Sequence, residues 1–428
     1  MVYNHVRGQN MINKIKKLDY SKILLIFLYL QPILDVIYGL SFNYLKIDVS
    51  LNTIIRFLFM IIAIFYLLFI NKDKKIKICT LMIGLYLIIF GIYTLKSKDF
   101  DILFYEMKNM LSFFFFPIIL LFFINIKDKI TIKEKHYFYL NLIYLAFILI
   151  PDLLGLGFRS YSEYKSGLIG WFYSSNSVGS IITILVPITM YYLMNNKKYL
   201  YLSFYLILTT YIFLSLGTKA PIIGLVITVL LFILRGFIKS IQNKKYKYIY
   251  VMIPIIILSI TASIIFVPKT SAYKNMKMHL ALFKINSINE ALNSKDFWNH
   301  IIFSQRLLFL EKTSNNYNNS AISTKLLGLG FVENYKLINE NYKTIEIDYF
   351  DIFYRCGFIG SFIYIFTIVV GLIVLLKDKI KYNFKNYAIC ISLFLSILLA
   401  FFCGHVFTGP ATAIIIGYII MKLDKKLV

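Results

Sequence analysis

The chain has 428 residues, of which 59% are hydrophobic and 18% aromatic, and it carries a formal net charge of +25. A soluble protein of this length cannot hide so much apolar surface, so the composition excludes an ordinary soluble globular protein and indicates lipid surroundings. The positive charge alone would fit a nucleic-acid-binding protein, but its distribution along the chain favours a topology signal, and no nucleic acid is expected as a partner.

Apolar segments long enough to cross about 30 Å of hydrocarbon recur from one end of the chain to the other. A backbone without water to bond to must form helices there, so we predict an all-α integral membrane protein with about twelve transmembrane helices. In chain order the predicted spans are 23–40, 51–71, 76–95, 109–125, 137–156, 177–194, 199–216, 219–238, 248–267, 350–376, 386–402 and 405–421.

Basic residues alternate in density between successive connections. Seven alternate segments carry 27 of the 46 basic residues, whereas the short connections between them carry six. The positive-inside rule then places both termini in the cytoplasm. The predicted organisation is a cytoplasmic tail (1–22), nine helices (23–267), one large extracytoplasmic loop between helices 9 and 10 (268–349), and three helices with a cytoplasmic C-terminus (350–428).

Within the large loop, Met278–Trp298 has apolar residues at helical spacing and predicts a helix on the membrane surface. The polar stretch Glu311–Ser323 predicts an exposed loop. No cysteine lies in the large loop, so no disulfide framework is expected, and no Cys/His cluster has the spacing of a metal site. The four cysteines lie inside or at the ends of predicted spans: Cys79, Cys356, Cys390 and Cys403.

Asp35 and Arg56 lie inside the first two predicted spans, at comparable depth from the outer face. A charged side chain in hydrocarbon costs at least about 2.5–3.5 kcal/mol, so each needs a partner or a function. Two interpretations are open, a buried ion pair that locks the two helices and a pair of charges that lines a polar cavity. Glu106, at the entry to the fourth span, is interpreted as an ordinary interfacial charge.

The connection Gly157–Ser180 combines two cations with the start of a helix. Arg159 and Lys165 precede a glycine-containing turn and the sequence Ser174–Asn176. Its side chains can cap the next helix, and the same helix N-terminus beside two cations would suit a phosphate. Lys219, in a very short outer turn, is either a phosphate contact or a lysine that reaches the interface.

The segment Ile345–Gly360 begins a long apolar span with four charged residues. Asp348, Asp351 and Arg355 are spaced i, i+3 and i+7, so they share one helix face. A pair between Asp351 and Arg355 alone would be worth roughly 0.2–0.5 kcal/mol. That pair would leave Glu346 and Asp348 unexplained.

Five short motifs follow one another in places assigned to the outer face: SSNSVG from Ser174, LGTKAPIIG from Leu216, SQR from Ser304, LLGLGF from Leu326 and EIDYFDIFYRCGFIG from Glu346. Through these motifs and the twelve-helix topology, the chain resembles the superfamily of O-antigen ligases and Wzy polymerases, which are bacterial envelope glycosyltransferases. The resemblance covers roughly residues 157–365.

The resemblance implies a GT-C-like, metal-independent glycosyltransferase without cofactors, at the outer side of the cytoplasmic (inner) membrane. Its substrate would be an undecaprenyl-pyrophosphate-linked oligosaccharide in membrane lipid, and its protein partners a flippase and a chain-length regulator. The family pattern has His-Asn where this chain has Glu346 and Ile347, and Ser-Arg where it has Thr218 and Lys219. A carboxylate base in place of a histidine is therefore our working hypothesis.

The chemistry supports a carboxylate beside cations. A sugar hydroxyl that attacks an anomeric carbon needs a base, and the departing pyrophosphate needs positive charge. The predicted base is Glu346 or Asp348, and His405 is either an assisting or a structural residue. The candidate residues are Glu346, Asp348 and Asp351 for catalysis, Arg159, Lys165, Lys219, Arg306 and Arg355 for pyrophosphate, and, as further candidates, Asn176, His405, Arg56 and Asp35.

We therefore predict a polymerase of a surface polysaccharide, whose acceptor is another lipid-linked repeat unit. A ligase that transfers the glycan to a different acceptor is the nearest alternative. A lipid-linked oligosaccharide flippase is another, but it needs polar residues through the centre of the bilayer, whereas these charges cluster at the outer ends of the spans. An inactive assembly subunit would not explain the placement of the charges.

Overall fold

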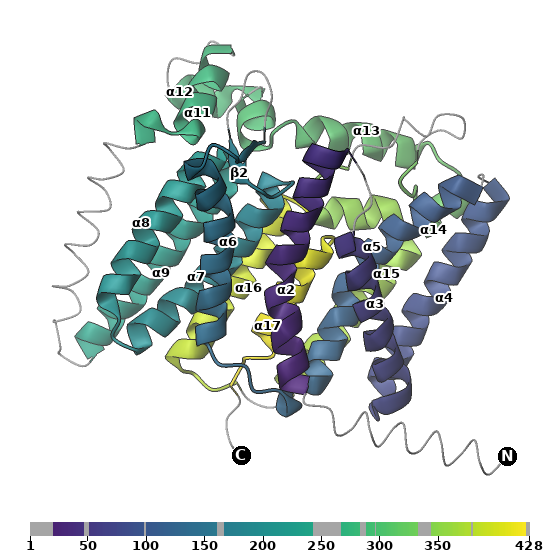
Figure 1. Ribbon diagram of the computed structural model, residues 1–428. Helices are drawn as coiled ribbons and strands as arrows, with labels where there is room; N and C mark the ends of the chain where they lie inside the picture. The colour runs from purple at the N-terminus through teal and green to yellow at the C-terminus, as the bar shows by residue number, and fades with distance from the viewer. Residues whose placement is uncertain are drawn as a thin grey trace.

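Figure 1 shows the computed structural model of the chain, a bundle of long helices with short helices across one end. The structure describes residues 20–46, 51–97, 100–160, 167–242, 267–282, 288–295, 297–332, 344–377 and 380–424. Three predicted features fall outside these ranges: most of the tail 1–22, Lys165, and the span 248–267 apart from its last residue.

In the described part of the chain, ten helices are long and apolar enough to cross a membrane. Each overlaps a predicted span, which confirms the all-α integral membrane class. They are α2 (Tyr20–Leu40, continued by η1, Ser41–Leu45), α3 (Leu51–Phe65, continued by η2, Tyr66–Ile70), α4 (Lys74–Ser97), α5 (Phe100–Ile126, followed by η3, Lys127–Lys129), α6 (Lys135–Leu153), α7 (Ser175–Asn195), α8 (Tyr199–Leu216), α9 (Lys219–Gln242), α15 (Asp348–Leu376) and α16 (Phe384–Phe402).

The last predicted span, 405–421, is shorter than expected. α17 runs only from Pro410 to Ile420, and eleven residues extend over about 16 Å, roughly half of the hydrocarbon core. Residues 403–409 before it are not helical. Buried backbone of this kind needs partners for its N–H groups inside the protein, and Asp348 accepts three of them.

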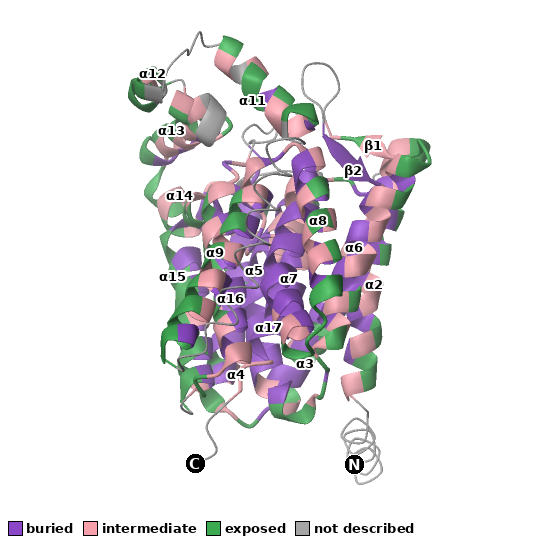
Figure 2. Ribbon diagram, turned by 90° about the vertical axis from the view of Figure 1, so that its left-hand side faces the viewer, coloured by how far each residue is buried: buried purple, intermediate pink, exposed green. Residues whose placement is uncertain are grey.

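α5 and α7 form the centre of the bundle, and α17 is packed among the helices around them. In the most apolar part of α5 and of α7, 78% of the residues are buried, against 28% in α3 and in α9. Figure 2 shows the buried residues concentrated along α5, α7 and α17. The outer helices carry exposed large apolar side chains such as Ile61, Leu85 and Phe204, as expected of surfaces in lipid.

Between α6 and α7 the chain forms a small antiparallel hairpin. β1 (Phe158–Arg159) pairs with β2 (Leu168–Gly170), so that Phe158 lies opposite Gly170. Gly170 has a φ of 59°, and a Cβ there would lie only 2.2 Å from the carbonyl oxygen of Phe147 in α6. This close approach fixes the segment that leads into α7.

The short helices lie across the end of the bundle at which this hairpin is found (Figures 1 and 2). They are η4 (Val267–Lys269), α11 (Ser271–Leu282), α12 (Ile288–Asn293), η5 (Phe297–Ile302), α13 (Arg306–Asn318) and α14 (Ile322–Leu327). The single surface helix predicted for 278–298 is wrong, because Ser294 is not helical. The loop predicted for 311–323 is also wrong except at 319–321, because α13 continues to Asn318 and α14 begins at Ile322. Tyr317 packs α13 against α15 through Phe353.

α15 is interrupted at Gly357, which has φ 63° and ψ −173°. The hydroxyl of Tyr86 in α4 lies 2.9 Å from the carbonyl oxygens of both Leu327 and Cys356. The N–H of Leu329 donates to the carbonyl of Tyr354 at 2.9 Å. These bonds join the end of α14 to the interruption in α15.

Candidate active site

Asp348 is the first residue of α15, and its side chain is completely buried. It accepts hydrogen bonds from the backbone N–H groups of His405, Val406 and Phe407 at 2.6, 2.9 and 2.6 Å. The hydroxyl of Thr408 donates a fourth bond at 2.9 Å. Hydrogen bonds to a charged group contribute roughly 1.5–3 kcal/mol each, so this carboxylate fixes the loop between α16 and α17.

Asp351 lies one turn later and is 2% exposed. It accepts hydrogen bonds from the N–H groups of Ile345 and Glu346 at 2.9 and 2.8 Å, and its Oδ1 lies 3.9 Å from Nε of Arg355. Arg355 is fully buried and donates from Nη1 to the carbonyl of Gly330 at 3.1 Å. Asp351 thereby holds Glu346 at a φ of 61°, a left-handed conformation that is uncommon outside glycine.

Glu346 has different surroundings, because its side chain is 29% exposed. Its Oε2 lies 2.8 Å from Nη2 of Arg306, the first residue of α13, and its Oε1 accepts no hydrogen bond from the described residues. Arg306 also donates to the carbonyls of Phe402 and Cys403 at 2.8 and 3.3 Å. Its Nε is buried and has no partner among the described residues. The pair joins α13, the segment just before α15 and the end of α16.

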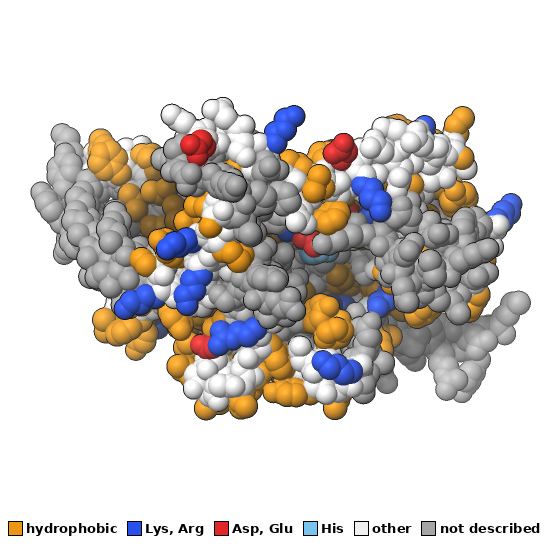
Figure 3. Space-filling model, turned by 90° about the horizontal axis from the view of Figure 1, so that it is seen from above, with side chains coloured by type: hydrophobic (Ala, Val, Ile, Leu, Met, Phe, Trp, Pro, Cys, Tyr) orange, Lys and Arg blue, Asp and Glu red, His pale blue; other side chains and the backbone are white. Residues whose placement is uncertain are grey.

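The loop after α16 touches Glu346 directly. Gly404 has a φ of 65°, and a Cβ there would lie 2.6 Å from the carbonyl carbon of Glu346. Burial raises the pKa of the neighbouring Cys403 thiol to about 12, against the opposite effect of Arg306, so this thiol stays protonated at neutral pH. His405 follows with a φ of 57°. Seen from this end, acidic side chains and a histidine are visible near the centre of the face (Figure 3).

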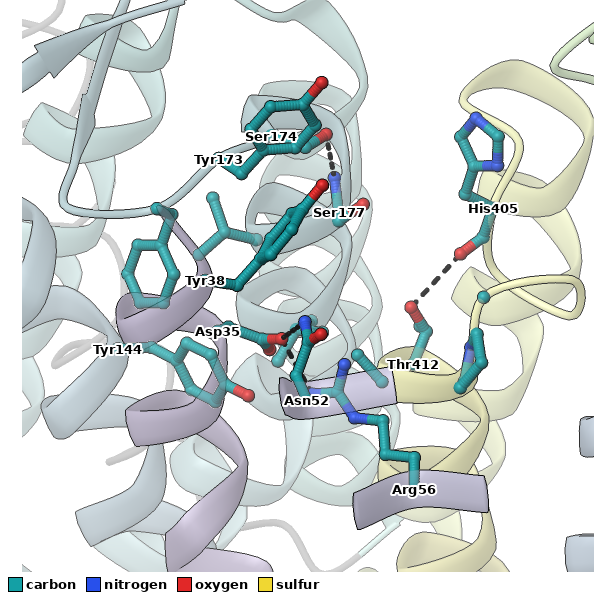
Figure 4. Close-up of a pocket in the computed structure, with 16 residues that line it drawn as sticks. Asp35, Tyr38, Asn52, Arg56, Tyr144, Tyr173, Ser174, Ser177, His405 and Thr412 are labelled. Atoms are coloured by element: carbon teal, nitrogen blue, oxygen red, sulfur yellow. Dashed lines mark hydrogen bonds and ion pairs between the residues drawn. The ribbon is translucent and has the colours of Figure 1, made fainter. Parts of the chain in front are cut away.

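A cavity of about 170 Å³ has His405 in its wall. Figure 4 shows Asp35 and Arg56 on one side of this cavity, with Ser174 and Ser177 above them and His405 opposite. Nη2 of Arg56 lies 2.7 Å from Oδ1 of Asp35. The ion pair between α2 and α3 is therefore present, and the same two residues also line the cavity, so the two interpretations of these charges are compatible.

The start of α7 forms another part of the cavity wall. Ser174 is its N-cap, and its Oγ accepts a hydrogen bond from the N–H of Ser177 at 3.4 Å. Asn176 lies in the first turn and is partly exposed. Of the capping residues considered in Ser174–Asn176, the structure assigns that role to Ser174.

The remaining predicted cations lie elsewhere. Arg159 is 61% exposed in β1, with Nη2 3.5 Å from Oδ1 of Asp152. Lys219 is the first residue of α9, close to Pro221, which packs on Gly179 in the second turn of α7. Among the described residues, no group of three His, Cys, Asp or Glu side chains is arranged to hold a metal ion. The residues that the structure brings together around Glu346 and the cavity are Asp348, Asp351, Arg306, Arg355, His405, Asp35 and Arg56.

Glu106 is a structural residue that the sequence interpretation missed. It is completely buried in α5, and its carboxylate accepts the N–H groups of Phe331 and Val332 at 2.7 and 3.0 Å. A Cβ on Gly330 would lie 2.6 Å from one of its oxygens. Glu106 therefore anchors the LLGLGF motif, whereas the sequence predicted an interfacial charge. The partners are 225 residues apart, and no local pattern links them.

Comparison of the chain with curated proteins and with solved structures found no match. The family described as O-antigen ligase like membrane protein matches residues 17–297 and 289–426, which is nearly the whole chain. This match agrees with the resemblance carried by the sequence motifs. The chain belongs to the O-antigen ligase-like family of membrane proteins.

Proposed function

We propose that this protein polymerises a bacterial surface polysaccharide. It transfers a glycan from undecaprenyl pyrophosphate to a sugar hydroxyl of another lipid-linked repeat unit, at the outer face of the cytoplasmic membrane. Family membership supports a multi-pass membrane enzyme that ligates or polymerises envelope glycans. The observation that carries the proposal is the Glu346–Arg306 pair, a partly exposed carboxylate 2.8 Å from a buried cation. The pair lies against the loop whose His405 lines the cavity.

Glu346 is assigned as the general base. A base must reach the acceptor hydroxyl with an available oxygen, and Oε1 of Glu346 accepts no hydrogen bond from the described residues. Asp348 and Asp351 are 0% and 2% exposed, and their oxygens are occupied by backbone N–H groups. They are positioning residues, Asp348 for the loop beside the base and Asp351 for the backbone of Glu346.

In the proposed reaction, the acceptor hydroxyl gives its proton to Glu346 while its oxygen bonds to the anomeric carbon of the donor sugar. The bond from that carbon to the pyrophosphate oxygen breaks, and the electron pair leaves with undecaprenyl pyrophosphate. Arg306, the cation 2.8 Å from Glu346, stabilises the charge that grows on this leaving group.

The other cations have different parts in this proposal. A contact of Lys219, at the start of α9, with the pyrophosphate stays a prediction. Arg355 is occupied by Gly330 and Asp351 and acts as a positioning residue. A contact of Arg159 or Lys165 with the pyrophosphate stays a prediction.

The test uses purified full-length protein in lipid nanodiscs with an undecaprenyl-pyrophosphate-linked oligosaccharide. The wild-type protein is expected to produce a ladder of longer lipid-linked glycans. Glu346→Gln keeps the size of the side chain but removes the base, so extension is expected to slow by about 10²–10⁴-fold. The matched control is Glu311→Gln, at an exposed position of α13, which is expected to keep the wild-type rate.

Each other result has a definite meaning. Near-normal extension by Glu346→Gln contradicts the assignment of the base. Transfer only to a separate acceptor indicates a ligase, the alternative that the description of the matched family favours. Transbilayer movement of an unchanged substrate indicates a flippase and contradicts the enzyme proposal.

A further inference from the structure

We propose that the cavity beside His405 binds a single uncharged sugar ring, the one that carries the acceptor hydroxyl. The inference rests on the glycosyl transfer proposed for this protein and names the ligand of the cavity. At about 170 Å³ the cavity is smaller than the roughly 300–1,000 Å³ of pockets that enclose drug-sized ligands. It therefore fits one ring and not a whole oligosaccharide.

A buried hydroxyl in the wall of this cavity has no partner among the described residues. Tyr144 in α6 lines the cavity and is fully buried, and its hydroxyl has no hydrogen-bond partner among the described residues. Figure 4 shows this hydroxyl directed toward the side of the cavity that holds Asn52 and Arg56. Buried hydroxyl groups are normally paired, so an unpaired one in the wall of a cavity is a candidate partner for a polar group of a ligand.

The ion pair next to Tyr144 also has unused hydrogen-bonding atoms. Oδ1 of Asp35 accepts from Arg56 at 2.7 Å and from Asn52 at 3.4 Å, whereas Oδ2 accepts from none of the described residues. Nε of Arg56 donates to Gln31 at 3.0 Å, and its Nη1 has no partner among the described residues. An acceptor and a donor are thus available side by side, as the hydroxyl groups of a sugar require.

The charges in the wall favour an uncharged ligand over a phosphate. Asp35 and Arg56 neutralise each other, and a phosphate bound to Arg56 would place its negative charge next to the carboxylate of Asp35. A sugar hydroxyl can donate to Asp35 and accept from Arg56 without that repulsion. The combination of a carboxylate, an amide and a guanidinium therefore suits a polyol.

Aromatic rings complete the wall. The rings of Tyr38 and Tyr173 are 5.1 Å apart in an edge-to-face arrangement, and those of Tyr144 and Phe172 are stacked at 5.6 Å. Such side chains offer an apolar surface for the C–H face of a sugar, and the tyrosines add polar ends. His405 lines the cavity, and the residue before it, Gly404, lies against the backbone of Glu346. Because the loop that contains His405 and Gly404 links the cavity wall to the backbone of the proposed base, we assign the ring to the acceptor.

The test measures binding apart from turnover. The probe is the oligosaccharide released by mild acid from the native lipid-linked substrate, titrated by calorimetry into full-length protein in nanodiscs. Tyr144→Phe removes one hydroxyl that has no partner in the described structure, so the melting temperature is expected to hold while affinity falls roughly five- to tenfold. Tyr211→Phe, on the exposed side of α8, is the matched control and is expected to keep wild-type affinity.

The outcomes test the sugar site independently of the proposed polymerase reaction. Absence of binding, or equal affinity in the wild type and Tyr144→Phe, overturns the sugar site. Binding of inorganic phosphate with the same dependence on Tyr144 overturns it in favour of an anion site. Glycan binding that depends on Tyr144, without a ladder of products, leaves the site standing and contradicts the polymerase. In the extension assay, Tyr144→Phe is expected to raise KM for the acceptor more than it lowers kcat.

Discussion

Asp348 and Glu346 are neighbouring carboxylates in the chain, but only Glu346 is open to a substrate. Asp348 accepts three backbone N–H groups and one hydroxyl in a fully buried position. In Asp348→Asn the amide nitrogen would face N–H donors whichever way the side chain turned. With roughly 1.5–3 kcal/mol for each bond to the charged group, we expect a loss on the order of 3 kcal/mol and a clear fall in the melting temperature.

Thermal unfolding followed by size-exclusion chromatography in detergent measures this loss. Glu346→Gln is the comparison, because it makes the same chemical change two residues away at a partly exposed position. Its melting temperature is expected to change much less, although its activity falls more. Equal melting temperatures for the two variants would contradict the structural role of Asp348.

The sequence spacing indicated which charges at the start of α15 share a face, but not what they bind. Asp348, Asp351 and Arg355 do lie together, and all three are buried. The partners of Asp348 are 57 to 60 residues further along the chain, and Arg306 is 40 residues from Glu346. These bonds exist because the loop after α16 returns to the start of α15, and no local pattern encodes that return.

At the scale of elements, the interruption of α15 depends on a glycine. Gly357 has a positive φ, and a Cβ there would lie 2.4 Å from the N of Gly328 and 2.7 Å from the carbonyl oxygen of Leu326. Both neighbours are backbone atoms and cannot turn aside. Gly357→Ala is therefore expected to displace α14 and the LLGLGF motif, with a severe loss of folded protein.

The control for this substitution is Gly84→Ala in α4, where a Cβ would meet no atom within 4 Å. An alanine in a helix is favoured over glycine by roughly 0.5–1 kcal/mol, so this variant is expected to be as stable as the wild type or slightly more so. The yield of monodisperse protein from membranes compares the two. Similar yields would mean that the junction of α14 and α15 tolerates a side chain.

Hydrophobic segment length predicted the long helices well, because a bilayer demands about 20 apolar residues of every span. The prediction from hydrophobic segment length failed where hydrogen bonds or side-chain packing, and not burial in lipid, decide the backbone conformation. The predicted span 405–421 loses its first turn to a loop that Asp348 holds. The polar stretch after Arg306 is helical as far as Asn318 because Tyr317 packs on α15, a contact that its polar composition did not indicate.

At the scale of the whole molecule, the two ends of the bundle use charge differently. At the end that holds Asp424, Lys385 lies 2.7 Å from Asp424 and 3.3 Å from Glu134, so opposite charges are paired. Although partial burial would raise the pKa of Asp424, hydrogen bonds from Lys385 and Asn383 lower it, and the carboxylate stays ionised. At the other end, Glu346 and the cavity keep unused polar atoms. This asymmetry suits an enzyme whose substrates arrive at one face.

The orientation of this asymmetry in the membrane is open to direct measurement. Cys390 is the exposed cysteine among the described residues, so Cys390→Ser gives a background with low labelling. Two single cysteines are then introduced at exposed positions, Asn319→Cys after α13 and Tyr382→Cys between α15 and α16. The first lies at the end with Glu346, and the second lies next to Asn383, which binds Asp424 near the C-terminus.

A membrane-impermeant maleimide is expected to label Asn319→Cys in intact spheroplasts and Tyr382→Cys only after permeabilisation. The reason is the positive-inside rule, because the connections rich in Lys and Arg belong to the end that contains Tyr382. Labelling both variants after lysis controls for the reactivity of each position. The reverse pattern would place Glu346, Arg306 and the cavity in the cytoplasm. A polymerase acting on glycans outside the membrane would then be excluded, whatever the chemistry of the Glu346–Arg306 pair.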